Sequence, residues 1–148
     1  MLSNTCKYAI RSLIYIAKFS SERKRIGIKK ISEDLDIPSP FLGKILQNLA
    51  RKKLLVSTKG PNGGFSLSKM PEEVSLFEII EMVEGDDYFN NCLIRLESCK
   101  CIKEKNKPLC PIHNRFAPVR KSLIEFYSNT TLAQVVDDYD HDDGKMTL

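Results

Sequence analysis

Apolar residues recur at intervals of three and four positions along most of this chain, and this spacing predicts a mainly α-helical fold. The clearest helix is predicted over residues 38–49. Ser39 is placed to cap this helix, and Pro40 suits its first turn, where a missing N–H costs no hydrogen bond. The residues predicted to face the core are Phe41, Ile45, Leu46 and Leu49.

A β-hairpin is predicted directly after this helix. Leu54–Thr58 and Phe65–Ser68 are short β-prone runs, and the loop between them contains an Asn-Gly pair, which is a strong hairpin-turn signal. A helix followed by a tight basic hairpin is typical of the recognition half of a winged helix-turn-helix. The alternative is an ordinary helix and hairpin in a small α+β domain.

The same helical spacing predicts most of the remaining elements. A short helix over residues 29–35 is joined to the helix of residues 38–49 by a turn, and the pair predicts a helix-turn-helix. Before this pair, a first helix is predicted that Ser3 or Thr5 caps and that ends near Phe19, followed by a very short strand at residues 26–28. After the hairpin, a helix is predicted from Ser75 to Glu84, where Gly85 ends it. A long helix from Cys110 or Pro111 to Ser128, with a kink or late start at Pro118, is predicted next, and then a last helix that Thr130 or Thr131 caps and that ends at Val136.

The predicted fold is therefore mainly α with a small β-hairpin wing, and it divides into three parts. Residues 1–70 form the winged helix-turn-helix DNA-binding region. Residues 71–136 hold a helix, a cysteine-containing loop and the long helix. Residues 137–148 form an acidic tail that is predicted to be disordered.

The distribution of charge indicates a partner for the first part. The net charge of the 148 residues is +4, but residues 1–70 sum to +10 and residues 71–148 to −6. A basic half that coincides with a candidate DNA-reading element predicts double-stranded DNA as its partner. The chain has no apolar run near the ~20 residues that a membrane span needs, and no signal-peptide pattern, so no membrane partner and a cytoplasmic location are expected.

The outward residues of the predicted recognition helix and wing are the candidate DNA contacts. Gln and Asn suit bidentate contacts to adenine, and Lys suits guanine or phosphate. Lys52, Lys53 and Lys59 are predicted to contact phosphate, and Asn62 at the tip of the wing is predicted to approach the minor groove. The predicted major-groove contacts are Ser39, Lys44, Gln47 and Asn48.

Cysteine content is the second informative feature, because four of the five cysteines fall between Cys92 and Cys110. An odd number of cysteines fits structural disulfides poorly. Thiols that cluster in a loop and are followed by His113 suit a soft metal or an iron–sulfur cluster, and the alternatives are redox-reactive thiols or inert cysteines. Cys6 lies on a predicted buried helix, where a cysteine is usually a small apolar residue.

Together these motifs resemble the Rrf2 (Rrf-two) family of bacterial winged helix-turn-helix transcriptional regulators, which includes IscR, NsrR and CymR. The resemblance covers residues 1–135 and rests on Tyr8–Leu13, the helix of residues 38–49, the Gly60–Phe65 wing and the cysteine loop before a long helix. The family implies a homodimer in which the long carboxyl-terminal helices cross between subunits, and a dimer implies an inverted-repeat operator. Its cluster-binding members hold an iron–sulfur cluster with three loop cysteines, whereas other members bind none.

Carried over by position, the resemblance implies that Cys92, Cys99 and Cys110 hold a labile 2Fe–2S or 4Fe–4S cluster, with His113 as a further ligand. The interval from Cys99 to Cys110 is longer than is usual in the family, so Cys101 is an alternative to Cys99. Some members take a carboxylate from the first helix of the partner subunit. No acidic residue lies at positions 5–7 here, which leaves Cys6 as an alternative ligand.

Three functions remain open at this point. The first is a dimeric regulator whose operator affinity is set by an iron–sulfur cluster in the cysteine loop. The second is the same regulator without metal, responding to thiol oxidation or to a protein partner. The third is a zinc or redox enzyme, which is disfavoured because the chain shows no catalytic triad, nucleotide loop or paired carboxylates. The sequence therefore predicts a transcriptional regulator and not an enzyme.

Overall fold

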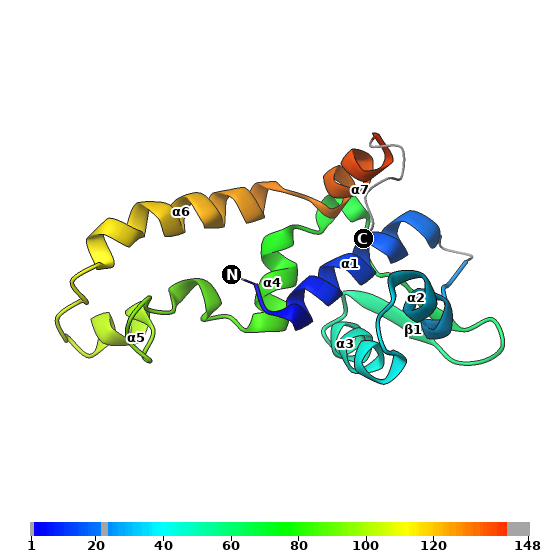
Figure 1. Cartoon of the computed structure of the whole chain (residues 1–148), viewed down its shortest axis with the longest axis horizontal. Helices are drawn as coiled ribbons and strands as arrows, with labels where there is room; N and C mark the ends of the chain where they lie inside the picture. Colours follow the sequence, from blue (N-terminus) through cyan, green and yellow to red (C-terminus); the bar gives the residue numbers. More distant parts are fainter. Residues whose placement is uncertain (1, 22–23, 142–148) are drawn as a thin grey trace.

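Helices and one hairpin make up the described part of the chain (Figure 1). The computed structural model describes residues 2–21 and 24–141, without the side chains of residues 100–102, 140 and 141. The α-helices are α1 (Asn4–Phe19), α2 (Ile28–Leu35), α3 (Ser39–Arg51), α4 (Leu76–Glu84), α5 (Cys99–Glu104), α6 (His113–Asn129) and α7 (Leu132–His141). The strands are β1 (Leu55–Thr58) and β2 (Gly64–Leu67), and the short 3-10 helices are η1 (Pro71–Glu73) and η2 (Tyr88–Asn90).

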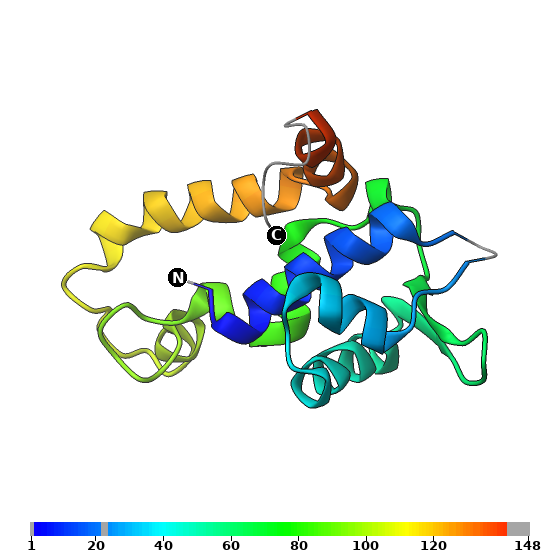
Figure 2. The same cartoon turned by 45° about the vertical axis from the view of Figure 1, so that its right-hand side comes forward.

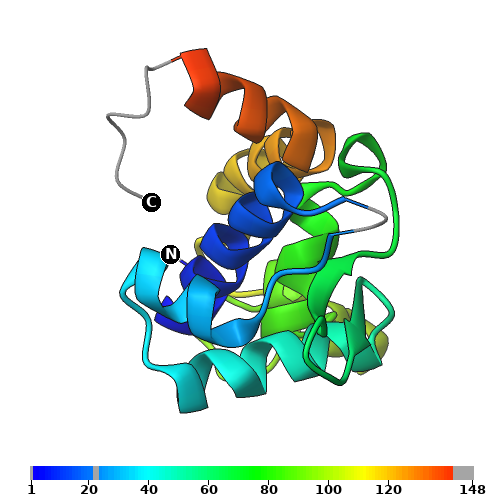
Figure 3. The same ribbon diagram turned by 90° about the vertical axis from the view of Figure 1, so that its right-hand side faces the viewer.

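Helix α1 lies at the centre of the fold, where it contacts α2, α3 and β2 as well as α4 and α7 (Figures 1 and 3). Ser3 caps this helix, as predicted, because its hydroxyl accepts the N–H of Cys6 at 3.1 Å. Contacts on several sides explain why α1 is apolar around much of its circumference. Fully buried residues of the core include Leu13, Ile16, Ile31, Leu42, Leu46, Leu49, Ile79 and Leu132.

The turn between α2 and α3 confirms the helix-turn-helix. Asp36 ends α2 in the left-handed backbone conformation, with φ of 51°. Ser39 is the first residue of α3 and not its cap, because Pro38 precedes the helix and the Ser39 hydroxyl donates to the Ser32 hydroxyl at 2.8 Å. The predicted cap is therefore wrong.

The face that α3 buries differs from the prediction by one residue. Leu42 is fully buried, whereas Phe41 is 38% exposed. The ring of Phe41 meets the ring of Tyr8 edge-on at the rim of the core, with 5.7 Å between the ring centroids. Leu42 and not Phe41 completes the stripe that is buried against α1 and β1; both residues fit a helical spacing, and the placement of α3 against α1 decides between them. The other buried residues of α3 are Ile45, Leu46 and Leu49.

The hairpin that forms the wing is confirmed, with a different turn from the one predicted. Strands β1 and β2 are antiparallel, with Leu55 opposite Leu67. The Gly63 N–H donates to the Gly60 carbonyl at 2.9 Å, which puts Pro61 and Asn62 at the centre of the turn. The hairpin turn is therefore not built on a central Asn-Gly pair.

A single residue replaces the short strand predicted at residues 26–28. Ile26 forms an isolated bridge with Phe65 through two backbone hydrogen bonds of 3.0 and 2.9 Å. Gly64 lies beside this bridge with φ of +144°, a conformation that L side chains rarely adopt. The bridge attaches the wing to the segment between α1 and α2.

The boundaries of α4 are those predicted. The Ser75 hydroxyl accepts the N–H of Glu78 at 3.2 Å, and Gly85 ends the helix with φ of 101°. Helix α6 begins at His113, slightly later than predicted, and Pro118 lies within it. Helix α5 was not predicted, because its sequence shows no apolar periodicity.

The last helix extends beyond its predicted end at Val136. Thr131 caps α7 by accepting the N–H of Gln134 at 3.3 Å, and the helix continues to His141. The Lys18 ammonium lies 4.3 Å from the centroid of the Tyr139 ring, and this contact with α1 supports the additional turn. Residues 137–141 of the predicted tail are thus helical, and residues 142–148 lie outside the described part of the chain.

The wing and the cysteine-containing segment lie at opposite ends of the molecule. Helix α6 extends away from the core, and the segment that carries α5 lies at the end opposite the wing (Figures 1 and 2). None of the described helices is long and apolar enough to cross a membrane.

Candidate functional site

The outward side of α3 is the first candidate site. A hollow of about 590 Å³ runs along it, lined by Pro40, Gly43, Lys44, Gln47 and Arg51. We call these five residues the recognition face. Lys44, Gln47 and Arg51 are exposed and spaced by three and four positions, so they lie on one side of the helix. Arg51 was absent from the sequence prediction, although its position four residues after Gln47 is the signal that identifies it.

The other predicted DNA contacts differ in their surroundings. Lys53, Lys59 and Asn62 are exposed at the end of α3 and in the wing, and Asn48 is half-buried. The hydroxyl of Ser39 is already bonded within the helix-turn-helix.

Lys52 departs from the prediction of a phosphate contact. Its ammonium donates to the Met82 carbonyl at 2.7 Å, in the last turn of α4. A cation is favoured at the C-terminal end of a helix, where the last carbonyl groups have no partner within the helix. In this structure the charge of Lys52 is therefore directed at the end of α4.

The second candidate site is the cysteine loop, which we define as residues 86–112. Cys92 follows η2, Cys99 begins α5, and the Cys110 carbonyl accepts the N–H of His113 at 3.0 Å, where α6 begins. Cys99 and Cys110 are buried and Cys92 is half-buried. Each of these three cysteines therefore lies at or near the end of a helical element.

Cys92 interacts with both other thiols of the loop. The sulfur of Cys92 is hydrogen-bonded by the backbone N–H groups of Arg95 and Ile94, and also by the thiols of Cys110 and Cys99. These bonds, the backbone ones above all, lower the pKa of Cys92 to about 7. Donation of its proton to Cys92 and burial raise the pKa of Cys110. The arrangement favours a thiolate at Cys92 and a thiol at Cys110.

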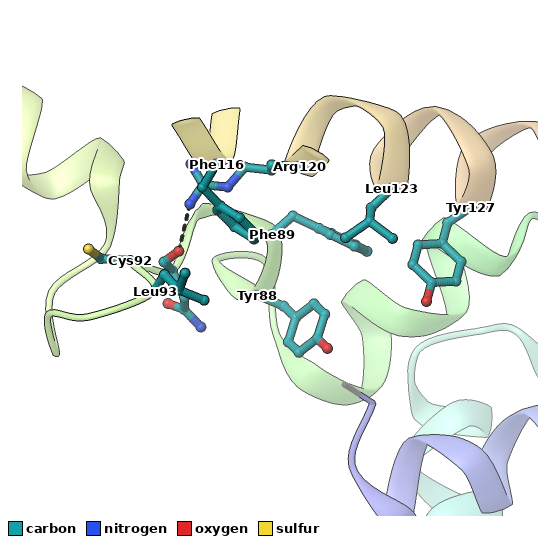
Figure 4. A pocket seen from close by; sticks show the side chains of 9 residues that line it. Tyr88, Phe89, Cys92, Leu93, Phe116, Arg120, Leu123 and Tyr127 are labelled. Carbon is teal, nitrogen blue, oxygen red and sulfur yellow. Dashed lines mark hydrogen bonds between the residues drawn. The ribbon is translucent and has the colours of Figure 1, made fainter. Parts of the chain in front are cut away.

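Arg120 of α6 reaches into the cysteine loop (Figure 4). Its guanidinium donates to the Asn91 carbonyl at 2.8 Å and to the Cys99 sulfur at 3.5 Å. Beside it lies a cavity of about 490 Å³, whose walls include Phe89, Phe116 and Tyr127. No sequence signal identified Arg120, because nothing in the primary structure distinguishes it from the other basic residues near the loop.

The further predicted ligands lie in different surroundings. His113 lines a separate cavity of about 410 Å³ together with Lys103 and Arg120. Cys101 belongs to α5, but its side chain lies outside the described residues. Among the side chains that the structure describes, no three His, Cys, Asp or Glu groups are arranged to hold a metal ion.

Cys6 is a core residue, which corrects the alternative that made it a ligand. It is fully buried in a cluster with Ile80 and Phe89. Burial raises the pKa of its thiol to about 12, and the nearby carboxylate of Glu84, which accepts its hydrogen bond, adds to this shift. A protonated, enclosed thiol is a poor ligand, since metals bind the thiolate.

Native thiol reactivity is expected to follow these pKa directions. Iodoacetamide should modify Cys92 at a rate that rises as pH approaches 7 and levels off above it, because the thiolate is the nucleophile. Cys6 should remain unmodified from pH 6 to 9 until the protein is unfolded. Mass spectrometry of peptides from time courses in metal-free buffer measures both rates. Equal rates for the two cysteines in the folded protein would contradict the assignment.

The fold and the recognition face define a winged helix-turn-helix regulator of transcription. The family profile described as "Rrf2: Iron-dependent Transcriptional regulator" matches residues 2–138, and the chain belongs to this family. A protein of Aquifex aeolicus described as an HTH-type transcriptional regulator is 31% identical over 137 residues, which are 92% of this chain and 91% of that protein. NsrR of Bacillus licheniformis is 26% identical over 140 residues, 95% of this chain and 94% of NsrR.

Solved structures share the fold. CymR, the global cysteine regulator of B. subtilis, aligns with a TM-score of 0.73 at 21% identity, covering 93% of this chain and 96% of CymR. T. potens IscR aligns with a TM-score of 0.68 at 22% identity, covering 100% of this chain and 93% of IscR. These relatives are transcriptional regulators and not enzymes, which confirms the class and the family resemblance predicted from the sequence.

Proposed function

We propose that this regulator is a cytoplasmic homodimer that binds inverted repeats in double-stranded DNA, with an affinity set by an iron–sulfur cluster in the cysteine loop. The observation that carries the proposal is the interaction of the Cys92 sulfur with the thiols of both Cys99 and Cys110. Membership of a family described as iron-dependent supports the choice of iron.

The recognition face supports sequence-specific DNA binding. Lys44 and Gln47 are exposed and have the donor groups that bind guanine and adenine edges in the major groove. Arg51, further along the same side, suits a bidentate contact to guanine or phosphate. Lys53 and Lys59 are exposed and suit phosphate, and Asn62 at the wing tip suits the minor groove.

The exposed apolar side of α6 supports a homodimer. Val119, Leu123 and Phe126 are 50%, 41% and 57% exposed. No residue of α6 is buried, so this helix contributes little to the core of its own subunit. A second copy of α6 crossing the first would cover these side chains, and it would present two recognition helices to one duplex.

The chemistry of the loop fits an iron–sulfur cluster. Thiolates are the usual protein ligands of such clusters, and Cys92, Cys99 and Cys110 would supply three of them. His113, near Cys110, is the candidate for a further ligand. A bound cluster would supply a group that responds to iron supply and oxidants. The loop residues that would hold it lie between α4 and α6 in the chain.

Anaerobic purification tests the cluster directly. A brown protein with matched iron and acid-labile sulfide is expected, and Cys92→Ser, Cys99→Ser and Cys110→Ser variants should each lose the visible absorbance. Cys6→Ser is the matched control and should keep it, because Cys6 lies in the core. A colourless wild-type protein after reconstitution with iron and sulfide would contradict the cluster proposal and leave the DNA-binding proposal standing.

Substitutions of Lys44, on the recognition face, and of Lys53, beyond the end of α3, should distinguish a base contact from a phosphate contact. Lys44→Ala is expected to weaken binding to a duplex selected from a random pool by about tenfold, which is typical for loss of one base contact. Lys53→Ala should reduce the slope of log affinity against log salt by about one unit, as removal of one phosphate contact does. Fluorescence anisotropy at several salt concentrations measures both, with Lys121→Ala on α6 as control. Unchanged affinity of Lys44→Ala at every salt concentration would contradict its role.

The pairing of Cys92 with Cys110 favours one second candidate, a regulator that senses oxidants without metal. A hydroperoxide would take two electrons from the Cys92 thiolate to form a sulfenic acid, which the Cys110 thiol would convert to a disulfide with release of water. Non-reducing mass spectrometry of the metal-free protein after peroxide treatment tests this alternative. A disulfide that changes DNA affinity would support it, and an unchanged affinity would exclude it.

A further inference from the structure

Arg120 links both ends of one segment of the cysteine loop to α6. The Asn91 carbonyl and the Cys99 sulfur both accept hydrogen bonds from one terminal nitrogen of its guanidinium, at 2.8 and 3.5 Å. An isolated bridge between Asn91 and Ser98 brings the ends of this segment together. One side chain from α6 thus contacts both ends of the segment where they meet.

The surroundings of Arg120 give its charge a fixed position. The guanidinium lies over the ring of Phe116, 5.3 Å from its centroid, which orients the planar group. Arg120 is the cationic residue among those that line the cavity of about 490 Å³, where the other walls are mainly aromatic and aliphatic. A cation in such surroundings is less screened than one in water, so it acts strongly on a neighbouring sulfur.

We propose that Arg120 positions Cys99 as a ligand, stabilises negative charge on its sulfur, and makes the geometry of the cysteine loop depend on α6. This inference rests on the proposed function for the cluster, but its structural part concerns residues 91–99 alone. Hydrogen bonds and positive charge at ligand sulfurs stabilise the more negative, reduced form of a cluster. The guanidinium should therefore raise the reduction potential of the cluster, in addition to holding residues 91–99 in place.

The test compares Arg120→Met and Arg120→Lys with the control Arg115→Met, which removes an exposed arginine from the same helix. In metal-free protein, Arg120→Met should speed amide hydrogen exchange in residues 91–99 by at least tenfold and leave α1 and α4 unchanged. After reconstitution, Arg120→Met should shift the cluster potential to more negative values and shorten the half-life of its absorbance in air several-fold. Arg120→Lys keeps the positive charge, so its cluster potential should lie between those of the wild type and Arg120→Met. Its amide exchange in residues 91–99 should be as fast as in Arg120→Met.

The outcomes distinguish the two proposals. Unchanged exchange in residues 91–99 of Arg120→Met, or an effect equal to that of Arg115→Met, would overturn the role of Arg120. An unchanged potential together with faster exchange would reduce Arg120 to a structural residue and overturn its effect on the ligand sulfur. A wild-type protein that never assembles a cluster would defeat the proposed function, while the exchange measurement would still decide whether Arg120 positions the loop.

Discussion

Replacing Leu123 and Phe126 together by glutamate is expected to convert the proposed dimer to a monomer and to weaken binding to an inverted-repeat duplex by about 100-fold or more. Both side chains belong to the exposed apolar side of α6, being 41% and 57% exposed. Two charges at the centre of an apolar interface would lose their hydration without gaining partners. The loss of affinity follows because linked half-site binding raises affinity by about 10²–10⁴ over one site alone.

Light scattering coupled to size-exclusion chromatography measures the mass, and anisotropy measures the affinity. Lys121→Glu is the matched control, because it changes the net charge by the same amount and lies away from the apolar side of α6. Both variants should keep the helical circular dichroism of the wild type, since neither alters a buried residue. A double variant that remained a dimer with full affinity would refute the assignment of α6 to the interface.

Gly64→Ala is expected to lower the free energy of unfolding by about 1–3 kcal/mol, the typical cost of a strained backbone conformation. Gly64 has φ of +144°, and a Cβ there would lie 2.4 Å from the Ile26 carbonyl oxygen. Relief of this clash would require the bridge between Ile26 and Phe65 to separate, which would displace the wing. DNA affinity should therefore fall together with stability.

Urea unfolding followed by circular dichroism measures the change in stability. Gly27→Ser is a suitable control, because a Cβ at Gly27 meets nothing within 4 Å and serine is favoured at this position before α2. The control should be as stable as the wild type or slightly more stable. A Gly64→Ala variant with wild-type stability and DNA affinity would show that the wing tolerates the displacement.

Local signals in the sequence were sufficient for much of the fold. Ser75 and Gly85 mark the start and end of α4 because a side-chain cap and a positive-φ glycine act within one turn of the chain. The winged helix-turn-helix was predictable for the same reason, since its turn and its wing carry short-range signals. The thiols that interact in the loop are three of the four cysteines that the sequence groups between Cys92 and Cys110.

Features that depend on contacts between distant elements were not predictable. The choice of Leu42 over Phe41 as a core residue depends on how α3 is placed against α1, and both residues satisfy a helical pattern. The extension of α7 depends on contact between Lys18 and Tyr139, on helices at opposite ends of the sequence. The position of Arg120 beside Cys99 depends on the return of α6 toward the core.

The hydrogen bond from Lys52 to the Met82 carbonyl joins the end of α3 to the last turn of α4. Helix α4 ends at Glu84, just before the cysteine loop, so this bond gives the recognition helix a direct contact with the helix that leads into the loop of the same subunit. The dimer-breaking double variant leaves this bond intact. Transmission within one subunit and transmission between two subunits can therefore be measured as separate quantities.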